Sequence, residues 1–207
     1  MRKTIIRSVF AGLATVIIAS CCGGNTATSN ENDAIKNIMS RKSVRSFTDE
    51  KITDEQMDIM LKAAMAAPSG MNLQPWSFVV LTDTSRYDKV FAGNFNMKVF
   101  KDAAAVVVFC ADTTQAVRGT EERVPNTLWR DDLGACTENF LLAAESLGLG
   151  AVWTACYPIA DRMGTVKTCL NLPAEVLPYS IVAVGHPDTE NMPKDKYDAS
   201  RIHIEHW

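Results

Sequence analysis

The chain has 207 residues, of which 47% are hydrophobic and 22% are charged, enough for one domain with a substantial core. Its 21 basic and 24 acidic residues leave a net charge of −3. This balance excludes the strongly basic composition typical of nucleic-acid-binding proteins, so no nucleic-acid partner is expected.

Residues 1–21 predict an export signal. Cations among the first seven residues precede an apolar run at residues 9–19, which is too short for a spanning helix. Small residues then lead to Cys21, as in a bacterial lipobox. This similarity implies lipidation of Cys21 and attachment to a membrane of the cell envelope through the lipid alone; the alternative is an ordinary signal peptide cut nearby. Residues 22–32, polar and rich in Ser, Thr and Asn, predict a flexible tether.

The next elements surround a cluster of cations. A short helical period covers residues 33–39 and leads into residues 41–45, Arg-Lys-Ser-Val-Arg. Thr53 and Gln56 are spaced as in a capping box, and an apolar stripe follows, which together predict an amphipathic helix over residues 54–67. The segments on either side of this helix can therefore lie close together.

The remaining elements alternate between strands and helices. Buried strands are predicted over residues 78–81, 104–110, 151–154 and 179–184, and helices over residues 131–147 and 160–170. A polar turn and helix are predicted over residues 82–90. The alternation predicts one α/β or α+β domain over residues 33–207. No G-x-G-x-x-G sequence joins a strand to a helix, so a Rossmann dinucleotide-binding unit is not expected.

The cysteines and histidines do not form a metal-binding or redox pattern. Beyond residue 22 the cysteines are Cys110, Cys136, Cys156 and Cys169, without a C-x-x-C pair or interleaved histidines. Buried thiols are expected at Cys110 and Cys136. Cys156 could be a redox thiol, but without a charged neighbour an inert thiol is favoured. All three histidines lie after residue 185 and are interpreted as ordinary surface or hinge residues.

Two segments carry groups suited to a phosphorylated polyol. Residues 41–45 offer three cations and a hydroxyl, and residues 68–76, P-S-G-M-N-L-Q-P-W, offer neutral hydrogen-bonding side chains. Together they resemble the opening signature of the nitroreductase family of FMN enzymes, R-[RK]-S-x-R-x-F followed by P-S-x-x-N-x-Q-P-W. Residues 93–96, 132–150 and 184–196 resemble later segments of the same family in the same order.

The resemblance implies a nitroreductase-like homodimer whose subunits have a central mixed sheet flanked by helices. It also implies a bound FMN. Arg41 and Ser43 would hold the phosphate and ribityl end with help from Lys42. Lys194 and Lys196 would complete the phosphate site. Arg45 and Asn96 would contact the pyrimidine edge of the ring.

A second group of contacts is implied for the ribityl chain and the ring. Pro68, Ser69, Asn72 and Gln74 would reach them from the neighbouring subunit. The backbone amides at Ala155 and Cys156 would approach N5 and O4 of the flavin. No side chain is nominated as an acid or base, since the cofactor performs the electron transfer while the protein binds, orients and tunes it.

Each assignment has an ordinary alternative. The cations of residues 41–42 and 194–196 could be solvated surface charge, and Ser69 and Asn72 could merely stabilise a turn. Gln74-Pro75-Trp76 could be chiefly structural, and Asn94 rivals Asn96. The chain also departs from the family pattern, with Glu138 where glutamine is common and Lys196 where arginine is frequent. Some relatives have a lysine near the position of Val99 that reaches the flavin ring, and here the nearest cation is Lys98.

The function implied is transfer of electrons from NAD(P)H through FMN to a nitroaromatic, quinone or similar acceptor, in a ping-pong scheme. Relatives that dehalogenate or reduce enones provide one alternative within the fold. Another alternative is an envelope flavoprotein that relays electrons without a dedicated small substrate, because NAD(P)H is scarce outside the cytoplasm.

Overall fold

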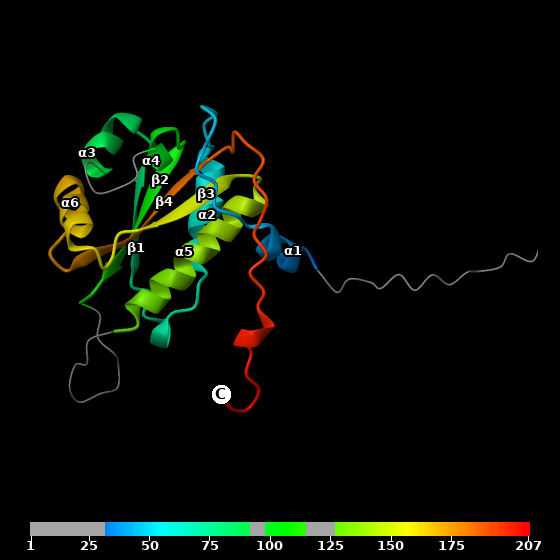
Figure 1. Ribbon diagram of the computed structural model, residues 1–207. Coiled ribbons are helices and arrows are strands. Elements are labelled where there is room, and N and C mark those ends of the chain that lie inside the picture. Colours follow the sequence, from blue (N-terminus) through cyan, green and yellow to red (C-terminus); the bar gives the residue numbers. More distant parts are fainter. Residues whose placement is uncertain (1–31, 92–97, 115–126) are drawn as a thin grey trace, which may run out of the picture. The chain divides into compact units, whose positions relative to one another are not determined.

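The computed structural model describes residues 32–91, 98–114 and 127–207, which lie in one compact unit (Figure 1). The expected signal segment with Cys21, most of the tether, and both Asn94 and Asn96 lie outside the described residues. Along the part of the chain that is described, no helix is both long and apolar enough to cross a membrane.

The described residues form alternating helices and strands, as the sequence predicted. The helices are α1 (Asp33–Ser40), α2 (Asp54–Met65), α3 (Tyr87–Phe91), α4 (Lys98–Lys101), α5 (Trp129–Ser146) and α6 (Ala160–Leu170). The strands are β1 (Trp76–Leu81), β2 (Ala105–Asp112), β3 (Gly150–Ala155) and β4 (Val176–Gly185). Single turns of 3₁₀ helix lie at η1 (Gly70–Asn72), η2 (Thr84–Arg86) and η3 (Ala199–Arg201).

The four strands form one sheet in the order β1-β2-β4-β3. A mixed sheet was expected, but all three ladders between these strands are antiparallel. Parallel pairing among the described residues is confined to an isolated bridge between Ser43 and Ala151. β2 and β4 are the central strands, and each outer strand runs opposite to its neighbour.

Helices cover both faces of the sheet. Successive side chains of the central strands point to opposite faces, so each face presents apolar side chains to the helices that pack on it. On β2, Val106 and Val108 belong to a core cluster shared with α3 and α6. Val107 and Phe109 belong to a second cluster shared with α2 and α5. In this second cluster the Phe109 ring meets the rings of Phe78 and Phe140 edge to face, with centroids 5.2 and 5.5 Å apart.

The basic segment after α1 is fixed at the outer edge of β3. The Val44 amide donates to the Ala151 carbonyl at 3.0 Å, and the Thr48 amide donates to His186 at 2.8 Å. Phe47, buried between these points, forms a bridge with Pro187. Residues 41–48 therefore lie between β3 and the C-terminal segment that leaves β4, which is drawn in orange and red in Figure 1.

Candidate functional site

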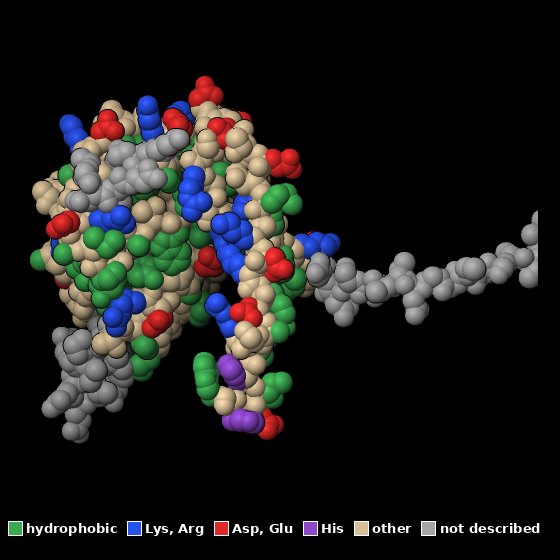
Figure 2. Space-filling view, in the orientation of Figure 1, with side chains coloured by type: hydrophobic (Ala, Val, Ile, Leu, Met, Phe, Trp, Pro, Cys, Tyr) green, Lys and Arg blue, Asp and Glu red, His purple; other side chains and the backbone are tan. Residues whose placement is uncertain are grey.

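The predicted phosphate ligands line one hollow of about 310 Å³, here called the basic hollow. It brings together the segment after α1 and the C-terminal segment, which are separated by about 150 positions in the sequence. Figure 2 shows Lys and Arg side chains gathered along the inner side of the C-terminal segment. The residues that line it are Arg41, Lys42, Ser43, Arg45, Asn191, Met192, Lys194 and Lys196.

Two cations of the basic hollow are paired with acids on α5. Arg41 Nε lies 2.9 Å from Glu138 Oε1, and Lys42 Nζ lies 2.9 Å from Glu145 Oε1. Within the described ranges, Arg45 and the two lysines of the C-terminal segment have no ion pair. The hollow thus has five cations against two carboxylates, an excess of positive charge that suits a phosphate.

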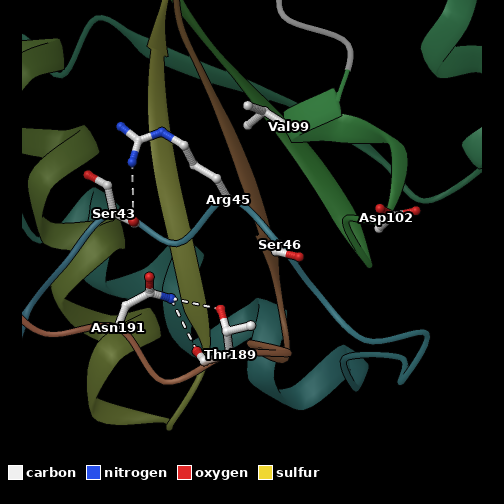
Figure 3. A pocket seen from close by; sticks show the side chains of 7 residues that line it. All are labelled: Ser43, Arg45, Ser46, Val99, Asp102, Thr189 and Asn191. Carbon is white, nitrogen blue, oxygen red and sulfur yellow. Dashed lines mark hydrogen bonds between the residues drawn. The ribbon is translucent and has the colours of Figure 1, made fainter.

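A second hollow of about 390 Å³ lies on the other side of Arg45 and is here called the Val99 hollow. In Figure 3, Arg45 and Val99 stand on opposite sides of its upper part, and Asn191 and Thr189 lie below. The Asn191 amide donates to the Thr189 carbonyl at 3.1 Å, which holds the end of this side chain in place. Ser43, Arg45 and Asn191 line both hollows, so the two are continuous along one wall.

Two acidic partners and three lining residues of these hollows were not predicted as site residues. Glu138 and Glu145 are seven residues apart on α5, a spacing that places both on one helical face, and this could have indicated a pair of partners for two cations. Asp102, Thr189 and Asn191 lie in segments without a regular pattern, so the sequence offers no comparable signal for them.

The loop between α2 and β1 is held in an unusual conformation by its own polar groups. Met71, Asn72 and Gln74 all have positive φ, of 51°, 55° and 51°. The Ser69 hydroxyl accepts from the Gln74 amide at 3.1 Å, and Asn72 Oδ1 accepts from Gln74 Nε2 at 2.9 Å. Left-handed residues other than glycine persist only where their surroundings support them, and they cluster at functional sites.

This loop is fastened to the N-terminal part of α5. The Gly70 amide donates to Asp132 Oδ1 at 2.8 Å, and a Cβ at Gly70 would lie 2.8 Å from Leu128 Cδ1. Pro68 and the polar residues of the loop line neither the basic hollow nor the Val99 hollow. The two halves of the expected site therefore do not meet among the described residues of one chain.

The end of β3 presents Ala155, which is exposed, followed by Cys156, which is buried. The Cys156 amide donates to the Tyr179 carbonyl at 3.1 Å, so it is engaged within the fold rather than open to a ligand. Burial raises the pKa of the Cys110, Cys136 and Cys156 thiols to about 12, which keeps them protonated and inert near neutral pH.

No group of three or more metal-ligating side chains occurs among the residues that the structure describes. His186 lies 3.5 Å from Glu50, and the rings of His203 and Trp207 stack at 4.1 Å.

Comparison with known proteins identifies related sequences and structures. Residues 38–92 and 85–186 match the Nitroreductase family. A protein of Archaeoglobus fulgidus, named as a candidate NADH dehydrogenase/NAD(P)H nitroreductase, is 36% identical over 84% of this chain and 99% of its own.

Two solved structures share the fold. One, a candidate NADH dehydrogenase/NAD(P)H nitroreductase of Bacteroides thetaiotaomicron, is 39% identical, with a TM-score of 0.78 over 86% of this chain and 99% of its own. A candidate nitroreductase of Desulfovibrio desulfuricans, solved in complex with FMN, is 30% identical, with a TM-score of 0.71 over 84% of this chain and 97% of its own.

Proposed function

Because this chain belongs to the nitroreductase family, we propose that it is an FMN-dependent oxidoreductase that passes electrons from NAD(P)H to a nitroaromatic, quinone or similar small acceptor. The observation that carries the proposal is the basic hollow, in which five cations converge from two distant segments. The FMN-bound relative from Desulfovibrio and the NAD(P)H nitroreductase names of the other two relatives support it.

The residues present fit the phosphate end of FMN. Lys194 and Lys196 are exposed and Arg41 lines the same hollow, so all three can approach a doubly charged group. Ser43 adds a hydroxyl to the same hollow. Arginine recognises phosphate through hydrogen-bond donors held in one plane, whereas lysine contributes a mobile point charge. The set can therefore both orient a phosphate and neutralise its charge.

The residues of the Val99 hollow fit the other end of the cofactor. Bound FMN supplies the electron-transfer chemistry, and its reduced ring carries negative charge at the pyrimidine edge. The Arg45 guanidinium is a cation that lines this hollow, where it can stabilise that charge. Val99 contributes an apolar contact on the opposite wall.

We expect the purified protein to be yellow and to hold close to one FMN per chain without a covalent bond. Acid denaturation followed by chromatography of the supernatant measures the flavin, and steady-state oxidation of NADH and NADPH with a quinone or nitroaromatic acceptor measures the activity. Release of FAD, or of no flavin after incubation with FMN, would contradict the proposal.

The N-terminal sequence favours a second candidate function, an envelope flavoprotein that relays electrons without NAD(P)H. We propose that Cys21 carries the lipid anchor; the support is the basic, apolar and small-residue order of residues 1–21. The assay above separates the two functions, because an electron carrier would hold FMN yet oxidise neither nicotinamide at a useful rate.

We further propose that the active form is a homodimer, with the loop of residues 69–74 completing the partner's site. This would join the two halves that one chain keeps apart. Exposed apolar side chains support the homodimer. Helix α1 has no buried residue, and its Ile38 and Met39 are 51% and 66% exposed. On the C-terminal segment, Ile204 and Trp207 are 79% and 98% exposed. A second copy would cover surface that is unfavourable in water.

The dimer is expected to have twice the mass of one chain in light scattering and to bury on the order of 2,000 Å² or more. Ile38→Glu should shift it toward the monomer and release FMN, because a charge would be placed in the contact. Ile159→Glu, the same change at a position 41% exposed beside α6, is the matched control and should do neither. A wild-type monomer that retains FMN would contradict the proposal.

A further inference from the structure

Arg41 differs from the lysines of the C-terminal segment in how its side chain is held. Its backbone closes α1, where the Arg41 amide donates to Asn37 at 3.2 Å. Its side chain is 17% exposed and ends against Glu138 of α5, with Nε 2.9 Å from Oε1. Lys194 and Lys196 are exposed and have no such partner among the described side chains.

Glu138 stands on a helix that is fastened to its neighbours. The next residue, Asn139, donates from Nδ2 to the Ala63 carbonyl at 3.1 Å and fastens α5 to α2. On the facing helix, Asn37 donates from Nδ2 to the Leu142 carbonyl at 2.9 Å and fastens α1 to α5. The helix that carries Glu138 is therefore bonded both to α1, which Arg41 closes, and to α2.

The contact leaves the outer part of the guanidinium available. Nε is the nitrogen nearest the aliphatic chain, and the two terminal nitrogens lie beyond it. A free arginine side chain has several rotatable bonds, and it loses conformational entropy when it binds a ligand. Because Glu138 already restricts Arg41, less of that entropy remains to be lost when a phosphate enters the basic hollow.

We propose that Glu138 is a positioning residue that orients Arg41 toward the terminal phosphate and thereby lets the site distinguish FMN from riboflavin. This inference rests on the proposed FMN function and assigns to α5 a part in selecting the phosphorylated cofactor. The negative charge of Glu138 does not prevent phosphate binding. Its side chain is 44% exposed, so water and salt screen the charge, and the hollow retains an excess of cations.

The test compares FMN with riboflavin, which lacks only the phosphate, in fluorescence titrations of the flavin-free protein. Glu138→Ala should raise the Kd for FMN about tenfold, the effect of losing roughly one well-placed charged contact. It should change the Kd for riboflavin less than about twofold. Glu138→Gln keeps an acceptor oxygen for Arg41 and should retain most of the FMN affinity.

Asp58→Ala is the matched control, because it breaks the ion pair with Lys62 at 2.6 Å on the exposed side of α2 and should alter neither Kd. Unchanged or tighter FMN binding by Glu138→Ala would overturn the inference alone. Equal losses for FMN and riboflavin, together with a lower melting temperature, would assign Glu138 a purely structural role and also overturn it. A wild-type protein that binds neither flavin would instead contradict the proposed function, and the inference with it.

Discussion

Gly150→Ala is expected to destabilise the protein by about 1 to 3 kcal/mol, the usual effect of inserting a methyl group where no space exists. A Cβ at this position would lie 2.7 Å from both Cβ and Cγ1 of Val44. Val44 is buried and lies between Ser43 and Arg45, so the added methyl group would push the basic segment away from β3. We therefore expect weaker FMN binding in addition to the loss of stability.

Urea denaturation and FMN titration measure the two effects. Gly164→Ala is the matched control, because no atom lies within 4 Å of the Cβ that this change would add on α6. That variant should be as stable as the wild type or more stable by up to about 1 kcal/mol, since alanine is favoured over glycine within helices. Wild-type stability and FMN affinity in Gly150→Ala would show that Val44 can move without displacing the site.

Arg45→Met is expected to lower the reduction potential of bound FMN by about 30 to 65 mV. The variant removes a cation that stabilises the reduced, negatively charged ring; one charge-assisted hydrogen bond contributes about 1.5 to 3 kcal/mol, which gives this range for two electrons. Arg45 lines the Val99 hollow as well as the basic hollow, and the proposed ring position rests on this. Spectroelectrochemical titration of the purified protein measures the potential.

Arg41→Met provides the contrast. Arg41 lines the basic hollow but not the Val99 hollow, so its loss should weaken FMN binding about tenfold or more while the potential stays near the wild-type value. The phosphate does not take part in the redox change. If both variants kept the wild-type potential and differed only in FMN retention, Arg45 would be a phosphate or surface cation, and its assigned role would be wrong.

The sequence by itself determined the local elements whose signals lie within a few residues. The capping box predicted at the start of α2 is present, because the Thr53 hydroxyl accepts from the Gln56 amide and the Gln56 side chain accepts from the Thr53 amide. Helix α6 spans the predicted residues 160–170. In both cases the decisive contacts join neighbours along the chain, so a short window contains the information.

Only the tertiary structure decided where the strands end and how they are ordered. β4 begins at Val176 rather than at residue 179, because β2 continues past a bulge at Phe109 and Cys110 and pairs with it as far as Asp112. α5 begins at Trp129, two residues before the predicted start, where the Trp129 ring packs 4.9 Å from that of Tyr157. Pairing and packing partners of this kind are distant in sequence and have no local signal.

The same division applies to the candidate site. Arg41, Lys42, Lys194 and Lys196 were predicted as phosphate ligands from the family resemblance, and the fold brings them to one hollow. The Lys42–Glu145 pair, which joins residues 103 positions apart, exists only because α5 packs beside the basic segment. The engaged amide of Cys156 likewise depends on the pairing of β3 with β4. Residue types along the chain specify which chemistry is available, and long-range packing decides which of those groups remain free to use it.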